Sequence, residues 1–200
     1  IGVYDEKEHQ KLEREKHLEM RMEQALKNGE FVPYLQPKYE LTHETIAGAE
    51  ALVRWVSPEE GMIFPGEFIP LFEKNGFIVE LDLYMFEQVC KMIESWHKNG
   101  YRIIPVSVNM SRGHFLVPNF FDRYKEILER YDVPKGSIEI ELTESLFLNE
   151  ISTMTDLVNK IHEVGLRCSI DDFGSGYSSL NMLKDIKVDA LKLDRVFFVK

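Results

Sequence analysis

The stretch Ser137–Ser145, SIEIELTES, alternates between apolar and polar side chains and decides the fold. Successive side chains of a β-strand point to opposite faces, so the stretch predicts a strand with two unlike faces. One face carries the apolar side chains Ile138, Ile140 and Leu142. The other face carries the polar side chains Glu139, Glu141 and Thr143. Such alternation normally marks a sheet with one face in water.

The same alternation recurs in other predicted strands of the chain. The predicted strands cover residues 31–41, 45–55, 102–110, 137–143, 167–171 and 189–195. Further polar side chains that alternate with apolar ones in these strands are Glu50 and Arg54, Asn109, and Lys192. Carboxylate, amide and amine groups are therefore expected on the polar faces of several strands.

Helices are predicted between most of these strands, at 79–99, 119–131, 150–164 and 178–186. Apolar residues in the first and third of them repeat at steps of three and four, which is typical of an amphipathic helix. Strands that alternate with helices favour an α/β fold with a parallel sheet. Because the apolar stripes of the helices must also be buried, we expect a barrel with apolar residues facing the helices and polar residues facing inward.

The stretch Ile170–Ser179, IDDFGSGYSS, ends an apolar run with two adjacent carboxylates and then two glycines. Inward carboxylates are costly unless they are paired or bound to metal. The candidate inner set comprises Glu50, Asn109, Glu141, Asp171, Asp172 and Lys192. Oxygen donors of this kind suit Mg²⁺ or Mn²⁺, and a two-metal site fits attack on a phosphodiester. In this interpretation Asp171 bridges both ions, Lys192 orients the attacking water and Arg54 binds a phosphate.

Each of these residues also has a plainer interpretation. A single Glu-Ala-Leu is common on helix surfaces, and a single Asp-Asp usually lies in a turn or a helix cap. Asn109 is also compatible with a satisfied core amide, and Lys192 with an ion pair to Asp194. The metal site is favoured because the five oxygen donors of this set fall at successive strand ends, where barrel active sites lie.

Composition narrows the class of protein. The 200 residues carry a formal charge of −10, which disfavours general binding to DNA or RNA. Cys90 and Cys168 lie in apolar segments and are expected to be buried thiols. No apolar run approaches the roughly 20 residues of a membrane helix, so a cytoplasmic protein is expected. Residues 5–28 predict a helix, which either leans on the domain as a solvated helix or links it to an upstream module.

The motifs, taken in order, resemble the EAL family of bacterial cyclic di-GMP phosphodiesterases. They are YLQPKYEL (34–41), AEALVRW (49–55), PGEFIPLFEKNG (65–76), SVNMS (107–111), IELTES (140–145), DDFGSGYSSL (171–180) and LKLD (191–194). The resemblance covers residues 31–200, and residues 1–30 resemble the exit of a GGDEF domain followed by a helical linker. The resemblance implies a modified (β/α)₈ barrel whose first strand runs antiparallel to the others.

The resemblance also implies a reaction, namely hydrolysis of cyclic di-GMP to linear pGpG with two Mg²⁺ or Mn²⁺ ions. It implies that Glu50, Asn109, Glu141 and Asp171 bind the first ion and that Asp171 and Asp172 bind the second. Lys192 would contact the catalytic water, and Glu144 would hold the DDFGSG loop. Contacts to the dinucleotide are implied for Gln36, Leu52 and Arg54.

The family pattern is incomplete at the end of the printed chain. A usual barrel has about 250 residues, so residues 31–200 are too few for a complete one. The family pattern also includes two further strands, a later metal-binding glutamate and a QGY motif, which these residues do not contain. The alternatives to a phosphodiesterase are an EAL-like module that binds cyclic di-GMP without cleaving it and an unrelated metal-dependent barrel enzyme. The resemblance also implies a homodimer and an upstream sensory or GGDEF module.

Overall fold

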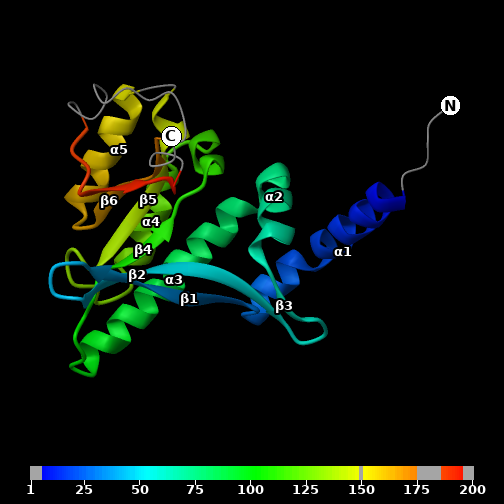
Figure 1. Ribbon diagram of the computed structural model, residues 1–200, viewed down its shortest axis with the longest axis horizontal. Coiled ribbons are helices and arrows are strands. Elements are labelled where there is room, and N and C mark those ends of the chain that lie inside the picture. Colours follow the sequence, from blue (N-terminus) through cyan, green and yellow to red (C-terminus); the bar gives the residue numbers. More distant parts are fainter. Residues whose placement is uncertain (1–5, 149–150, 175–185, 196–200) are drawn as a thin grey trace.

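One mixed sheet forms the centre of the protein in the computed structural model, which describes residues 6–148, 151–174 and 186–195 (Figure 1). Its strands are β1 (Phe31–Glu40), β2 (Thr45–Ser57), β3 (Gly61–Ile63), β4 (Val106–Asn109), β5 (Ile138–Thr143), β6 (Arg167–Phe173) and β7 (Ala190–Leu193). The spatial order is β1-β2-β4-β5-β6-β7, and β3 pairs with β2. Strand β1 is antiparallel to β2, whereas β2, β4, β5, β6 and β7 are parallel. The expected antiparallel first strand is therefore confirmed.

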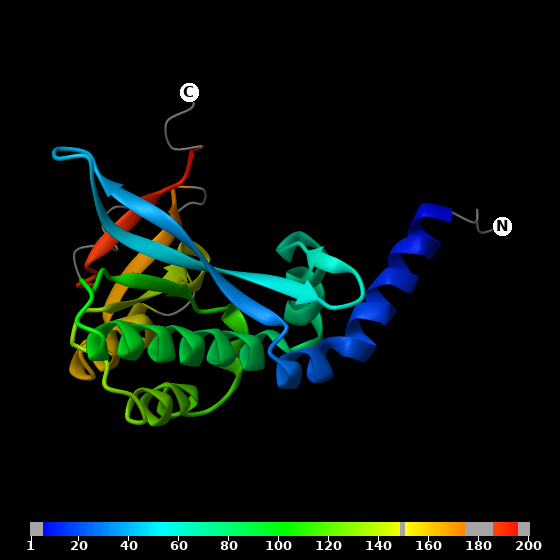
Figure 2. The ribbon, with the colours of Figure 1, turned by 90° about the horizontal axis from the view of Figure 1, so that it is seen from below.

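The helices provide the cover that the apolar strand faces require. They are α1 (Glu6–Asn28), α2 (Pro65–Asn75), α3 (Ile78–Lys98), α4 (Phe120–Leu128) and α5 (Ile151–Glu163), with short 3₁₀ helices η1 (Arg112–Leu116) and η2 (Glu144–Leu148). Figure 2 shows α3 and α4 on the same side of the sheet. Ile138, Ile140 and Leu142 of β5 are buried in one core with residues of α3. The predicted division between apolar and polar strand faces is confirmed here.

The described sheet is open, with β1 and β7 at its two edges. On β7, Leu191 and Leu193 are 39% and 43% exposed. These apolar side chains were expected to face helices, and no described helix covers them. Among the described residues, no helix is both long and apolar enough to cross a membrane.

Helix α1 packs through a narrow stripe that includes the buried Leu18 and Ala25. Arg21 fixes the helix to the turn after β2, because its guanidinium donates to Ser57 Oγ at 2.8 Å and to Glu60 Oε1 at 2.5 Å. The same guanidinium lies 5.8 Å from the centre of the Trp55 ring. Figure 1 shows the amino-terminal part of α1 extending away from the sheet.

The start of β4 and the presence of helix α2 differ from the predicted elements for local reasons. Residues 102–105 do not join β4, since Pro105 has no N–H for the ladder, whereas its carbonyl accepts from Ala49 N–H at 2.9 Å. Helix α2 and strand β3 were not predicted; α2 begins with Pro65, which is suited to a first helical position, and contains Pro70. The helix predicted at 178–186 lies almost entirely outside the described residues.

Candidate metal and phosphodiester site

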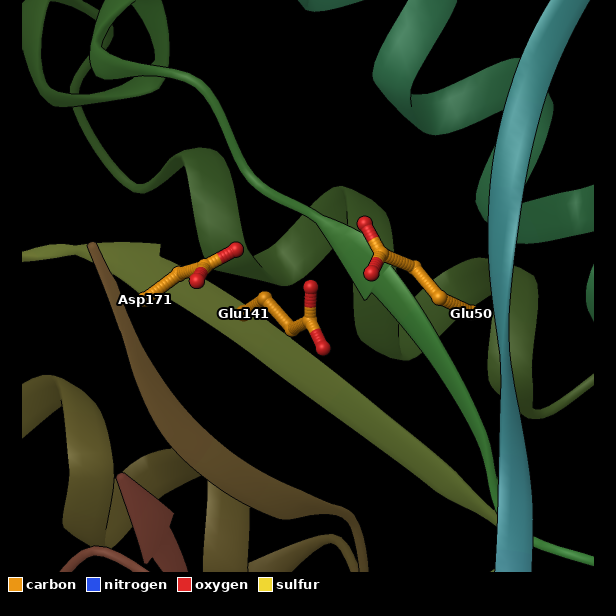
Figure 3. A group of neighbouring side chains, drawn as sticks. All are labelled: Glu50, Glu141 and Asp171. Atoms are coloured by element: carbon orange, nitrogen blue, oxygen red, sulfur yellow. The ribbon is translucent and has the colours of Figure 1, made fainter. Parts of the chain in front are cut away.

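Three carboxylates from three strands converge near the carboxyl ends of β5 and β6. Glu50 of β2, Glu141 of β5 and Asp171 of β6 each offer an oxygen, and these oxygens lie within 4.8 Å of one another. Figure 3 shows the three side chains projecting toward a common space. The alternation that places Glu50 and Glu141 on the polar faces therefore brings them together with Asp171.

Lys192 of β7 joins the three carboxylates. Its Nζ donates to Glu50 Oε2 at 3.0 Å, to Glu141 Oε2 at 2.8 Å and to Asp171 Oδ2 at 2.6 Å. Burial would lower the pKa of Lys192, but the hydrogen bonds with Asp171 and Glu141 outweigh it and the pKa is raised. A charged ammonium group therefore lies among the three carboxylates.

Lys38 of β1 is a member of the site that was absent from the predicted set. Its Nζ donates to Glu141 Oε1 at 2.8 Å and to Ser107 Oγ at 2.8 Å. Burial would raise the pKa of Glu141, yet the hydrogen bonds from Lys192 and Lys38 outweigh burial and lower it. Alternation along β1 gave a usable signal, because Lys38 shares a face with Gln36, which pairs with Glu50 in the sheet.

Asn109 and Asp172 flank the three carboxylates. Asn109 Nδ2 donates to Glu50 Oε1 at 3.2 Å. Asp172 does not belong to the group of three, and its φ of 55° lies where the pairing of β6 with β7 is irregular. Burial and then the charges of Asp171 and Asp194 raise the pKa of Asp172. The chain therefore leaves the regular strand conformation at Asp172, whose carboxylate lies outside the group of three.

Glu144, at the start of η2, contacts the segment that follows the two aspartates. Its buried Oε2 accepts the N–H of Gly174 at 2.8 Å. Residues 175–180 of that motif lie outside the described residues. The contact ties the end of β6 to the segment after β5.

The predicted dinucleotide contacts lie along β1 and β2. Leu52 and Arg54 line a cavity of about 270 Å³ together with Asn109. The guanidinium of Arg54 donates to Val53 O at 2.8 Å and lies 5.9 Å from the Tyr34 ring centre. Asp172 and Glu144 line a second cavity of about 270 Å³. A larger cavity of about 700 Å³ beside η1 contains none of the predicted residues, so we assign the site from the carboxylates and not from cavity size.

The donor set fits a divalent cation. Carboxylate oxygens are ligands that Mg²⁺ and Mn²⁺ prefer. The ammonium group of Lys192, bonded to one oxygen of each of Glu50, Glu141 and Asp171, shows that these oxygens can surround a cation. The group can therefore hold a metal ion.

Comparison with known proteins gives a consistent result. The sequence model of the EAL domain matches residues 19–200. The chain is 35% identical over 179 residues to signaling protein YkoW of Bacillus subtilis, covering 90% of this chain and 22% of that protein. It is 34% identical over 185 residues to cyclic di-GMP phosphodiesterase NbdA of Pseudomonas aeruginosa, covering 92% and 24%.

A solved structure shares this architecture. The PaMucR phosphodiesterase, in complex with c-di-GMP, superposes with a TM-score of 0.83 and 33% sequence identity. The match covers 90% of this chain and 73% of that one. The chain spans about a quarter of the length of the curated relatives named above.

Proposed function

Because the chain belongs to the EAL domain family, we propose that its protein hydrolyses one phosphodiester bond of cyclic di-GMP to give linear pGpG. The observation that carries the proposal is the convergence of Glu50, Glu141 and Asp171 with Lys192 at the strand ends. All four residues occupy positions that the motif resemblance assigned to the reaction.

Two Mg²⁺ or Mn²⁺ ions would complete the site. Glu50, Asn109, Glu141 and Asp171 would hold the first ion, and Asp171 with Asp172 the second. The ions would lower the pKa of a water and withdraw charge from the phosphate. The carboxylates of this chain supply the negative charge that keeps the ions in place.

The remaining residues would bind the dinucleotide and orient the attacking water. Lys192 would donate a hydrogen bond to the attacking water, since its ammonium group already lies among the carboxylates. Arg54 would contact a phosphate oxygen, and Gln36 and Leu52 would contact the dinucleotide. Glu144 would hold the segment that begins at Gly174 against the site, through the hydrogen bond already present.

The test is product formation by the purified protein. With Mg²⁺ or Mn²⁺, chromatography should show cyclic di-GMP converted to pGpG, and Glu50→Ala or Asp171→Asn should slow the conversion by about 10³-fold. Glu126→Gln, on the exposed face of α4, is the matched control and should retain it. Tight binding of cyclic di-GMP without any turnover by the wild type would contradict the proposal and support a receptor.

We also propose the assembly context that the resemblance implies. Residues 1–30 would link the domain at 31–200 to an upstream sensory or GGDEF module, and two copies would form a homodimer. Sedimentation at several concentrations tests the dimer, and a monomer at all of them would contradict it.

A further inference from the structure

The carboxylate of Glu141 has a different cationic partner on each oxygen. Lys192 donates to Oε2 at 2.8 Å, and Lys38 donates to Oε1 at 2.8 Å. The Glu141 side chain is 0% exposed, so neither oxygen is solvated by bulk water. A buried carboxylate without partners would be strongly unfavourable, which explains why both oxygens are paired.

Lys38 contacts polar side chains of two strands, β4 and β5. Its Nζ is 2.8 Å from Ser107 Oγ and 3.4 Å from Glu139 Oε1. Glu139 has partners besides Lys38, since Ser169 Oγ donates to it at 3.0 Å and Arg167 Nε lies 3.9 Å from its Oε2. Glu139 therefore does not depend on Lys38 alone, whereas Oε1 of Glu141 has Lys38 as its cationic partner.

We propose that Lys38 is a positioning residue for the cation site. By holding Oε1 of Glu141, Lys38 directs Oε2 toward Glu50 and Asp171. The inference rests on the proposed function, because it takes these carboxylates as cation ligands. Groups that orient metal ligands commonly change metal affinity by about 10- to 100-fold when they are removed.

The hydrogen bond to Ser107 makes Lys38 suited to this task. Ser107 lies on β4 and pairs with Glu50 of β2 and with Glu139 of β5 in the sheet. Lys38 is thus fixed from β4 while it holds a side chain of β5. A side chain with two short hydrogen bonds has little rotational freedom, so the carboxylate of Glu141 is held in one orientation.

The experiment measures Mn²⁺ binding by electron paramagnetic resonance of the free ion. The Glu50→Gln/Asp171→Asn double variant defines binding outside the site. Lys38→Met should raise the Kd for Mn²⁺ by about 10- to 100-fold. Arg167→Met removes a cation that contacts Glu139 and not Glu141, and its Kd should stay within about threefold of the wild type.

A second variant separates positioning from charge balance and from folding. Lys38→Met/Glu139→Gln removes one positive and one negative charge, so the net charge of the interior is unchanged while Oε1 of Glu141 still loses Lys38. We expect this variant to unfold near the wild-type temperature without metal and to keep the weakened Mn²⁺ binding. Wild-type affinity in this variant would overturn the proposal, because the loss of Lys38 would then not weaken Mn²⁺ binding when the net charge is unchanged.

The Mn²⁺-binding experiment can fail or succeed independently of the test for cyclic di-GMP hydrolysis. Absence of cyclic di-GMP turnover in the wild type, together with the expected Mn²⁺ affinities, would refute the reaction and support the role of Lys38. A wild type that binds no more Mn²⁺ than the Glu50→Gln/Asp171→Asn variant would overturn the inference. Equal losses in Lys38→Met and Arg167→Met would overturn it as well.

Discussion

Strand β2 belongs to two regions that are stabilised by different interactions. Around Trp55, aromatic rings of β1 and α2 pack at centroid distances of 4.9 to 6.1 Å. Around Glu50, five residues earlier, the contacts are hydrogen bonds that the carboxylate accepts from the Asn109 amide and the Lys192 ammonium group. The aromatic region gains free energy from removing apolar surface from water, whereas the charged region must offset the cost of burying carboxylates. Stability and catalysis should therefore respond to different substitutions.

The largest expected effect is on activity. Asp171→Asn removes one of three carboxylates and should lower kcat/KM by about 10³-fold, since metal ions supply several kcal/mol of charge stabilisation. Thermal unfolding in the absence of metal should change little, because the substitution also relieves repulsion from Glu50 and Glu141. Activity near that of the wild type would show that the charged region is not catalytic.

The aromatic region should show the opposite response. Trp55→Ala removes a fully buried ring and its hydrogen bond to Glu30, and should destabilise the protein by about 3–5 kcal/mol. Urea denaturation measures the loss, and Tyr101→Ala, at a 66% exposed position, is the control that should change stability by less than about 0.5 kcal/mol. If Trp55→Ala lost activity without losing stability, the division between the two regions would be wrong.

A smaller effect is expected where α1 meets the aromatic region. Arg21→Ala removes hydrogen bonds to Ser57 and Glu60 and the contact with the Trp55 ring, at a cost of about 1–2 kcal/mol. Because salt screens ion pairs, the difference from the wild type should shrink in 1 M NaCl. A difference that is independent of salt would mean that packing on Trp55, not charge, holds α1.

The smallest signal is expected from the reactivity of the two cysteine thiols in the folded protein. Burial raises the pKa values of Cys90 and Cys168 to about 12 each. Since only the thiolate reacts, roughly one thiol in 10⁴ would be reactive at pH 8. A chromogenic disulfide reagent should therefore titrate two thiols per chain only after denaturation, and rapid reaction of the native protein would contradict the burial.

Sequence periodicity was sufficient to predict the polar residues around Glu50, but it did not identify Lys38 as one of their neighbours. Alternation in β2, β4 and β5 predicted the faces of Glu50, Asn109 and Glu141, because a strand's period is fixed by its backbone. Lys38 was missed since its partners Ser107 and Glu141 lie 69 and 103 residues away along the chain. Alternation places Lys38 on the same face as Gln36, but it does not show that β4 and β5 supply the partners of Lys38.

Helix α2 was not predicted from the sequence, for a different reason. Its buried residues Phe68, Leu71 and Phe72 follow helical spacing, but Pro70 lies between them and disfavours a helix when only propensity is considered. Packing against Phe31 and Trp55 compensates for this proline. The aromatic region is therefore less readable from local sequence than the charged one.

The position of Lys192 on the last described strand has a consequence for the order of folding. Glu50 and Lys192 are 142 residues apart, and β7 joins the sheet only beside β6. During synthesis the three acidic side chains leave the ribosome before the lysine that bonds to all of them. The addition of β7 is thus the step at which their mutual repulsion is relieved by that lysine, and such a distant contact is expected to form late.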